Sequence, residues 1–270
     1  MDDFEFDRII QFIKDSSGII PRDSHKSGIK NFLEKRIEEL GINSSAYYNL
    51  LLSDIWEREL LINSTTVNET YFFREELQFA LLKERIFPEI MRTGVSPVKI
   101  WSAASSSGEE IYSLLLLTSS LGIKTECIAS DINSAVLKQC ESGRYTKKSL
   151  KSVDGALFQN LLAPYKMENG SIEFTDRVKE KITCRRINLS KLEDFPTGQH
   201  IIFLRNVFIY FDLEMRHKIL QKISDECLCD GGYIFVSMNE VASVDFSILP
   251  KNLEKISDGK VFYFKKKSGV

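Results

Sequence analysis

The chain has 270 residues, of which 43% are hydrophobic and 27% are charged, and its formal net charge is -2. These values are typical of an ordinary globular protein. The small negative charge argues against general attraction to nucleic acid or to anionic membranes. The five cysteines show no C-x-x-C spacing and the three histidines lie far apart, so we expect no metal site.

The N-terminal stretch "MDDFEFDRIIQFIK" is acidic and amphipathic. It lacks the basic start and apolar core of a signal peptide, and no apolar run reaches the ~18 residues that a membrane span needs. We therefore expect a cytoplasmic protein with reduced thiols and no direct membrane insertion. Nothing in the pattern requires more than a monomer.

Residues 1–91 show apolar stripes at helical spacing and no convincing strand. One stripe covers Phe4–Ile13, and a second covers Ile29–Leu40 and ends at Gly41. A further clear helix is predicted over 74–91. We expect residues 1–91 to form a helical domain, followed by the linker "RTGVSP" at 92–97.

After Pro97, short apolar strands alternate with helices, which predicts a doubly wound α/β sheet. The predicted strands are 98–103, 125–130 and 200–204, and the predicted helices are 109–122, 133–142 and 213–228. Two final strands at 232–238 and 260–267 have no predicted helix between them and are expected to pair antiparallel at the sheet edge. Between these elements, residues 163–187 alternate around Asn169-Gly170, a strong hairpin signal that predicts a small antiparallel insert.

The first strand leads into the loop "SAASSSG" and then into a helix that opens on Glu109 and Glu110. A helix N-terminus attracts anions, and G-x-G-x-x-G loops bind pyrophosphate there. This loop has the single glycine Gly108, and its carboxylates would repel a phosphate. They suit a cationic cofactor without phosphate, such as S-adenosylmethionine, whose ammonium one glutamate could bind. The alternative is that the two acids only favour the helix start.

Asp131 follows the second strand, 22 residues after Glu109. An acidic residue about 20 residues beyond the loop of a nucleotide-binding βαβ unit hydrogen-bonds the ribose. The alternative is that Asp131 caps the helix that begins near Asn133. With the loop upstream, the ribose role is favoured.

Two other stretches place polar residues beside predicted core. "FLRNVFIYFD" (203–212) puts Arg205 and Asn206 after a buried strand, at the sheet edge where α/β folds bind ligands. The alternative is a polar turn. "TTVNETYFFREE" (65–76) precedes a helix, and the alternative there is a capping region with Phe72 and Phe73 in the core. That alternative leaves the arginine unexplained.

Together these stretches resemble the CheR family of chemotaxis receptor methyltransferases. The family patterns W-S-A-x-x-S-x-G-E-E-P-Y-S, T-N-x-T-x-F-F-R-E, D-I-D and C-R-N-V-x-I-Y-F-D stand here as "WSAASSSGEEIYS", "VNETYFFRE", "DIN" and "LRNVFIYFD". The order and spacing run from about residue 4 to about residue 265. Ile111, Leu204 and Asn133 depart from the patterns, and Asn133 weakens a ribose role for that position. "SMNEVAS" (237–243) replaces a G-x-S-E turn, and no role is predicted for it.

The resemblance implies an N-terminal all-helical domain, then a Rossmann-like class I S-adenosylmethionine-dependent methyltransferase domain over 98–270 with a small antiparallel β-subdomain. It implies transfer of a methyl group from S-adenosylmethionine to glutamate side chains of chemoreceptors. Arg74 and Tyr210 are predicted near the transferable methyl group, with Arg74 anchoring the substrate carboxylate. The predicted cofactor-binding residues are Asn68, Thr70, Arg74, Glu109, Asp131, Asn188, Leu189, Arg205 and Asn206. Glu109 is predicted to hold the cofactor ammonium, and Glu110 to face away.

The predicted chemistry needs no general base, because a glutamate carboxylate is already ionised at neutral pH. The leaving group is a neutral thioether, so catalysis rests on alignment and desolvation of an in-line displacement. Rival predictions are a methyltransferase for RNA or a small molecule, and a non-catalytic adaptor that keeps the cofactor pocket. Arg205-Asn206-Val207 stands where many N-methyltransferases have N/D-P-P-Y, and the presence of Arg74 and Tyr210 argues against the adaptor.

The expected partner is the Glu- and Gln-rich helical bundle of a chemoreceptor cytoplasmic domain. Arg22, Lys26 and Lys30 recur at i, i+4 and i+8, so they share a helix face. The resemblance implies that this face binds acidic receptor helices. The alternative is an ordinary solvated face, since Glu34 interrupts the basic stripe one turn later. The hairpin "KMENGSIEF" is short, with one glycine, so we predict no dependence on a receptor C-terminal tether peptide.

Overall fold

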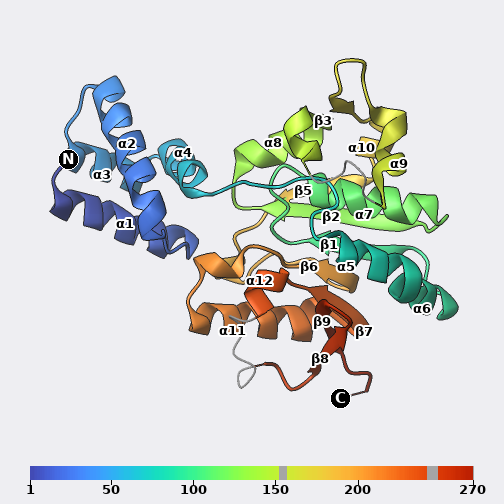
Figure 1. Cartoon of the computed structure of the whole chain (residues 1–270). Coiled ribbons are helices and arrows are strands. Elements are labelled where there is room, and N and C mark those ends of the chain that lie inside the picture. Colours follow the sequence, from blue (N-terminus) through green and yellow to red (C-terminus); the bar gives the residue numbers. More distant parts are fainter. Residues whose placement is uncertain (152–156, 242–248, 270) are drawn as a thin grey trace.

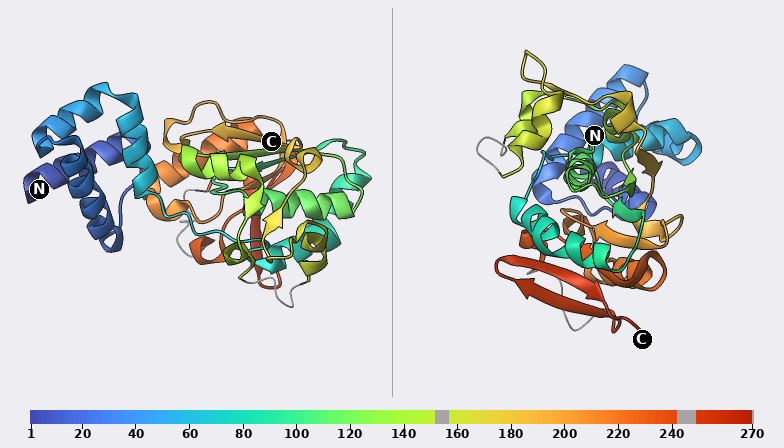
Figure 2. Two further views of the ribbon diagram at one scale, coloured as in Figure 1. Left: turned by 90° about the horizontal axis from the view of Figure 1, so that it is seen from above. Right: turned by 90° about the vertical axis from the view of Figure 1, so that its right-hand side faces the viewer.

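The computed structural model describes residues 1–151, 157–241 and 249–269. It has a helical N-terminal lobe and an α/β lobe, which stand side by side in Figure 1 and remain distinct from above in Figure 2. The helical lobe consists of α1 (Asp3–Ser17), α2 (Asp23–Leu40), α3 (Ser44–Ser53) and α4 (Ile55–Thr65). Asp2, Asn43 and Asp54 cap three of these helices with their side chains.

The helical lobe has its own apolar core, which includes Ile9, Leu33, Tyr47 and Leu61. Polar contacts join it to the α/β lobe. Asn133 Nδ2 donates to Thr66 Oγ1 at 2.7 Å, and Arg186 Nη1 lies 2.7 Å from Glu59 Oε2. The loop between α1 and α2 also contacts the α/β lobe, because the backbone N–H of Ile20 donates to the carbonyl of Tyr210 at 2.9 Å.

The α/β lobe is built on a seven-stranded sheet in the order β5-β2-β1-β6-β7-β9-β8. Its strands are β1 (Val98–Ser102), β2 (Thr125–Asp131), β5 (Ile182–Arg186), β6 (Gln199–Phe203), β7 (Leu228–Phe235), β8 (Leu253–Asp258) and β9 (Val261–Lys266). The first five strands in the sheet order are parallel, and β9 pairs antiparallel with both β7 and β8. The predicted doubly wound sheet and its antiparallel edge are confirmed.

Helices cover both faces of the sheet. Neighbouring residues of β1 show the division: Ile100 packs into a core cluster with α7 (Glu109–Ser120), and Trp101 packs into a second cluster with α11 (Leu213–Lys222). The remaining elements of this lobe are α5 (Glu76–Leu81), η1 (Leu82–Ile86), α6 (Phe87–Arg92), α8 (Ser134–Ser142), η4 (Leu189–Lys191), η5 (Phe208–Tyr210), η6 (Ile223–Cys227) and α12 (Met238–Val241).

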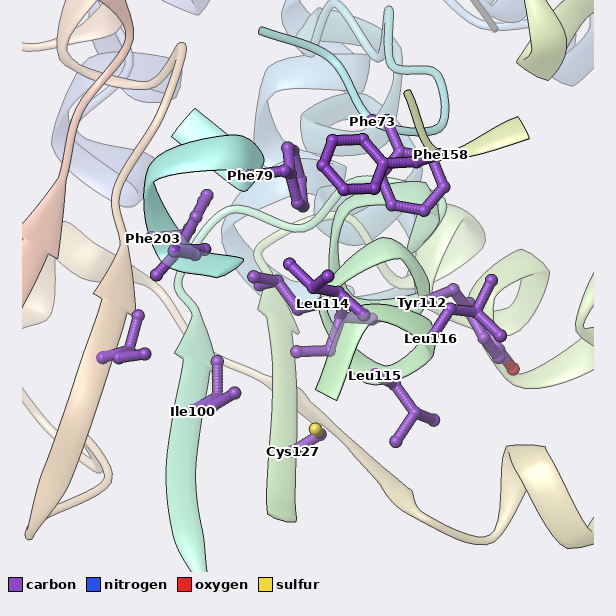
Figure 3. Packing of buried hydrophobic residues seen from close by; sticks show 14 of the residues in the cluster. Phe73, Phe79, Ile100, Tyr112, Leu114, Leu115, Leu116, Cys127, Phe158 and Phe203 are labelled. Atoms are coloured by element: carbon purple, nitrogen blue, oxygen red, sulfur yellow. The ribbon is translucent and has the colours of Figure 1, made fainter. Parts of the chain in front are cut away.

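The predicted domain boundary at residue 91 does not match the packing. The segment from Phe72 to Ile90, with α5, η1 and α6, lies in the same core cluster as α7 and the sheet. Figure 3 shows Phe73 stacked on Phe158 beside Phe79 and the leucines of α7. The sequence pattern gives each helix an apolar face but not the surface that it covers, so α5 and α6 were placed in the wrong lobe.

The predicted insert at 163–187 is also placed differently. The turn at Asn169-Gly170 is present, with the N–H of Met167 donating to the carbonyl of Ser171 at 2.9 Å. However, β5 is not part of a hairpin, because it pairs in parallel with β2 at the edge of the main sheet. The small subdomain instead consists of β3 (Arg144–Tyr145), η2 (Lys147–Leu150), α9 (Gln159–Leu162), η3 (Ala163–Tyr165), β4 (Ile172–Glu173) and α10 (Asp176–Lys179), with β3 antiparallel to β4.

Among the described residues, no helix is both long enough and apolar enough to cross a membrane.

Candidate active site

A pocket lies at the carboxyl ends of β1, β2 and β6, where ligands bind in α/β folds. The 66–75 segment, which connects α4 to α5, forms another of its walls, and Ser17 and Ile19 of the helical lobe also line it. The pocket holds about 890 Å³ of space, including its open mouth, which is in the range of small-molecule sites. The predicted site residues that line it are Asn68, Thr70, Arg74, Asp131, Asn188, Leu189, Arg205, Asn206 and Tyr210.

The loop after β1 folds toward Asp131. The backbone N–H of Ser106 donates to Asp131 Oδ2 at 2.9 Å, and the N–H of Asn133 donates to Oδ1 at 3.0 Å. Burial raises the pKa of Asp131, and these N–H groups oppose the shift. The cap of α8 is Asn133, whose Oδ1 accepts from the N–H of Ala135. Asp131 is therefore not the helix cap, and its carboxylate lines the pocket.

The two glutamates at the start of α7 have the opposite orientation from the one predicted. Glu110 lines the pocket, whereas Glu109 does not. Glu109 is 3% exposed, and its carboxylate accepts from the hydroxyls of Ser107 and Ser149, each at 2.7 Å. Gly108, the residue before α7, has a left-handed backbone with φ of 94°.

Glu110 takes part in a buried ionic cluster. Its Oε1 accepts from Ser102 Oγ at 2.6 Å, and its Oε2 lies 3.3 Å from Arg205 Nη1. Burial raises the pKa of Glu110, and the Arg205 charge opposes this shift. Arg205 is 4% exposed, and its Nε and Nη1 have no hydrogen-bond partner. The floor of the pocket thus carries a carboxylate and a guanidinium in contact.

Arg74 and Tyr210 both line the pocket from different segments. Arg74 Nη1 donates to the carbonyl of Glu69 at 2.8 Å, and its guanidinium lies 5.6 Å from the centre of the Tyr71 ring. The Tyr210 hydroxyl donates to the carbonyl of Val67 at 3.3 Å. Burial raises the pKa of Tyr210, so the phenol is neutral at physiological pH. Backbone carbonyls of the 66–75 segment therefore accept hydrogen bonds from both side chains.

Asn188 and Leu189 lie beyond β5. Asn188 Nδ2 donates to the carbonyl of Ser16 at 3.0 Å, while its Oδ1 accepts from the N–H of Ser190. Leu189 is 5% exposed. Elsewhere in the pocket wall, the backbone carbonyl of Asn68 accepts from Ser106 Oγ at 3.3 Å. These contacts close the pocket between the helical lobe, the 66–75 segment and the loop after β1.

The basic face predicted on α2 does not line the pocket. Lys26 Nζ lies 2.9 Å from Asp23 Oδ1, and Lys30 Nζ lies 3.4 Å from Asp3 Oδ1. Arg22 is exposed just before α2, and its charge lowers the pKa of Tyr210, against the larger effect of burial. Arg22 is therefore close enough to the pocket for its charge to act on Tyr210.

Two further carboxylates, one buried and one half-buried, contact segments of the pocket wall and are not among the predicted site residues. Glu240, from the "SMNEVAS" stretch, accepts from the backbone N–H of Asn206 at 2.6 Å. Glu75 accepts from Ser237 Oγ at 2.6 Å. Glu75 is the last residue of the motif "VNETYFFRE", in which Asn68, Thr70 and Arg74 are predicted site residues and Glu75 is not. Positions 242 and 243 of the "SMNEVAS" stretch lie outside the described residues.

The pocket residues fit a cationic, phosphate-free cofactor. Three acidic residues, Glu69, Glu110 and Asp131, line the pocket, and the loop between β1 and α7 carries one glycine rather than a phosphate-binding set. A carboxylate at a helix start would repel phosphate and attract an ammonium or a sulfonium. No cluster of three or more His, Cys, Asp or Glu side chains suited to a metal ion occurs among the described residues.

The sheet order, the pocket at its carboxyl edge and the acid after β2 define the class I S-adenosylmethionine-dependent methyltransferase fold. Residues 68–254 match the family model described as "CheR methyltransferase, SAM binding domain". The chain belongs to the CheR methyltransferase family. The matched range begins in the 66–75 segment, which agrees with the packing of α5 and α6 on the sheet.

Similar curated proteins carry corresponding names. The chemotaxis protein methyltransferase of Escherichia coli K12 is 34% identical over 243 residues, covering 86% of this chain and 82% of that protein. A probable chemotaxis protein methyltransferase of Rhizobium etli is 32% identical over 243 residues, covering 86% of this chain and 90% of that protein. The chemotaxis protein methyltransferase of Borreliella burgdorferi is 28% identical over 267 residues, covering 93% of this chain and 91% of that protein.

Proposed function

We propose that this protein transfers a methyl group from S-adenosylmethionine to glutamate side chains on chemoreceptor cytoplasmic helices. The products would be glutamate methyl esters in chemosensory adaptation. The relatives named as chemotaxis protein methyltransferases support this proposal. The observation that carries it is that the guanidinium of Arg74 and the phenol of Tyr210 line one pocket together with the carboxylates Glu110 and Asp131. A guanidinium suits a carboxylate substrate, and an ionised carboxylate needs no general base, whereas an amine or hydroxyl nucleophile must lose a proton.

Arg74 is proposed to anchor the substrate carboxylate. A guanidinium forms strong, directional hydrogen bonds to a carboxylate, and Arg74 is held in the pocket wall by its bond to the carbonyl of Glu69. Tyr210 is proposed to pack beside the reacting groups as a neutral phenol. Both side chains would align the carboxylate for an in-line displacement and exclude water from it.

We assign the cofactor contacts from the residues that line the pocket and from the family patterns. Bound S-adenosylmethionine supplies a methyl group on a cationic sulfur, which leaves as the neutral thioether S-adenosylhomocysteine. We propose Glu110, in place of Glu109, as the acceptor for its ammonium, because Glu110 lines the pocket. Asp131 would accept from the ribose hydroxyls. The remaining cofactor contacts are proposed for Asn68, Thr70, Arg74, Asn188, Leu189, Arg205 and Asn206, with no metal ion.

The receptor is proposed to approach from the side of Arg22. Lys26 and Lys30 already have acidic neighbours, so Arg22 is the α2-region cation that we favour for attracting an acidic helix. The tight turn at Met167–Ser171 supports a receptor interaction that does not depend on a tether peptide. We propose that the protein acts in the cytoplasm as a monomer.

Transfer of labelled methyl groups tests the proposed function. The purified protein is incubated with methyl-labelled cofactor and with either receptor cytoplasmic fragments or total RNA. We expect label in the receptor fragments that mild alkali releases as methanol, since methyl esters hydrolyse readily. Label in RNA alone would favour the RNA methyltransferase. Cofactor binding without turnover on any receptor would favour the adaptor.

A further inference from the structure

The segment 237–240, which follows β7, contacts both chain segments that carry the candidate catalytic residues. One of its contacts is to the turn that ends at Tyr210, and the other is to the residue after Arg74. The four residues are Ser237, Met238, Asn239 and Glu240. They lie far from both segments in sequence, so the contacts are a product of the fold.

Glu240 holds the turn before Tyr210. Its side chain is buried, with 1% exposure, and its Oε2 accepts from the N–H of Asn206 at 2.6 Å and of Ser237 at 3.4 Å. Its Oε1 accepts from the N–H of Ile209 at 3.4 Å. Asn206 has φ of 54°, a left-handed conformation that is uncommon outside glycine and needs support from its surroundings. The carboxylate of Glu240 provides that support.

Glu75 connects the same segment to Arg74. Glu75 also has a left-handed backbone, with φ of 59°. Its Oε1 accepts from Ser237 Oγ at 2.6 Å, and its Oε2 accepts from the N–H of Met238 at 3.1 Å. The position of the backbone beside Arg74 is thus fixed to the segment that also holds the 206–210 turn.

We propose that Glu240 is a positioning residue that, through the segment 237–240, fixes Tyr210 relative to Arg74. A buried carboxylate is costly unless its oxygens are hydrogen-bonded. Here the oxygens accept from the backbone N–H groups of Asn206 and Ile209 in the pocket turn and from that of Ser237 in the segment itself. Displacement of a reacting geometry by about 1 Å lowers a rate by about 100-fold, so the turn has to be held firmly. The inference depends on the proposed function only because receptor methylation is the reaction that is assayed.

Glu240→Gln is the first variant, because it keeps the shape and removes one acceptor. An amide nitrogen facing the N–H of Asn206 or Ile209 would place two donors together. We expect kcat for receptor methylation to fall by about 100-fold. The dissociation constant of the cofactor product, measured by calorimetry, should rise by less than about tenfold, since Asn206 is the only proposed cofactor contact on the displaced turn and Asp131 and Asn188 are not touched. A merely structural residue would not separate the two quantities in this way.

Ser237→Ala tests the other end of the segment and guards against a Glu240 variant that fails to fold. It removes the hydroxyl that donates to Glu75, and kcat should fall by about 10-fold with cofactor affinity retained. Glu254→Gln, at an exposed position of β8, is the matched control and should leave both quantities unchanged. Folded variants with kcat within about threefold of wild type, or with cofactor affinity reduced as much as kcat, would overturn the inference.

The failure of the proposed function would be seen separately, as a wild-type protein that methylates no receptor. In that case a crystal structure of Glu240→Gln decides the inference. Displacement of the 206–210 turn, with loss of the bond from Tyr210 to the carbonyl of Val67, supports it. An unchanged turn overturns it.

Discussion

Arg205 Nη2 donates to the backbone carbonyl of Arg74 at 2.6 Å. The guanidinium that makes this bond also lies 3.3 Å from Glu110 and 3.9 Å from Glu75. One buried cation therefore joins the loop after β6 to the 66–75 segment and to the start of α7. Three segments of the pocket wall therefore meet at this side chain.

Replacing Arg205 by Met should lower the free energy of unfolding by about 3 kcal/mol, because two carboxylates lose the cation that compensates their burial. Urea unfolding followed by circular dichroism measures this change. The double variant Arg205→Met/Glu110→Gln should recover part of the loss, since one uncompensated charge is removed. A loss below about 1 kcal/mol, or no recovery, would show that the ionic cluster is weakly coupled.

Arg74→Ala should reduce receptor methylation by about 100-fold or more, because the substrate carboxylate loses its proposed anchor. The fold should persist, since the Arg74 side chain donates to the backbone carbonyl of an exposed residue, Glu69. Steady-state rates and the melting temperature are the measurements. Arg92→Ala, at an exposed position of α6, is the control. Full activity of Arg74→Ala would remove Arg74 from the mechanism.

The orientation of the two glutamates on α7 makes a distinct prediction for each. Glu110→Gln should weaken binding of S-adenosylmethionine by about 10-fold or more, as a carboxylate that faces an ammonium is lost. Glu109→Gln should change it by less than about threefold, because its carboxylate bonds to Ser107 and Ser149 outside the pocket wall. Calorimetric titration of both variants provides the comparison. The reverse order of effects would restore the role predicted for Glu109.

Stability should depend on pH through Glu109. Burial raises its pKa in the folded protein, whereas an unfolded glutamate titrates near ~4.3. The folded state therefore holds the proton more tightly, and the free energy of unfolding falls as pH rises from the unfolded pKa through the raised one. Glu109→Gln lacks this dependence. The free energy of unfolding of the wild type minus that of Glu109→Gln should decrease as pH rises across that window and then level off. An increase of this difference with pH would contradict the burial effect.

The sequence allowed the sheet, its antiparallel edge and nine of the residues that line the pocket to be predicted. The strand-loop-helix pattern around Gly108 and the position of Asp131 are local features, so they could be located without tertiary information. The choice between Glu109 and Glu110 could not be made in this way. Adjacent helical residues point in directions about 100° apart, so which glutamate faces the pocket depends on how α7 packs against the sheet.

Long-range contacts account for the other differences. The period-two pattern of Ile182–Arg186 is the same in a hairpin and in a parallel edge strand, so β5 was assigned to the insert. Glu240 meets Asn206 across 34 residues of sequence, and no local pattern indicates that contact. The apolar faces of α5 and α6 are equally compatible with either lobe until their neighbours are known.

Gly108 is expected to tolerate no side chain. A Cβ atom there would lie 2.3 Å from Cys140 Sγ, and its φ is +94°. Gly122 also has a positive φ, of +69°, but nothing within 4 Å of its Cβ position, so it is a matched control for backbone strain alone. Gly122→Ala should cost about 1 kcal/mol of unfolding free energy, and Gly108→Ala clearly more. Equal costs would show that Cys140 moves aside freely.

The most direct test of the account is the chemical identity of the modified residue. Receptor cytoplasmic fragments treated with the protein and S-adenosylmethionine are digested and sequenced by tandem mass spectrometry. The account predicts one added methyl group on glutamates of the helical bundle, lost after mild alkali and absent with Arg74→Ala. Methylation of any other side chain, or of RNA in place of the receptor, would contradict it.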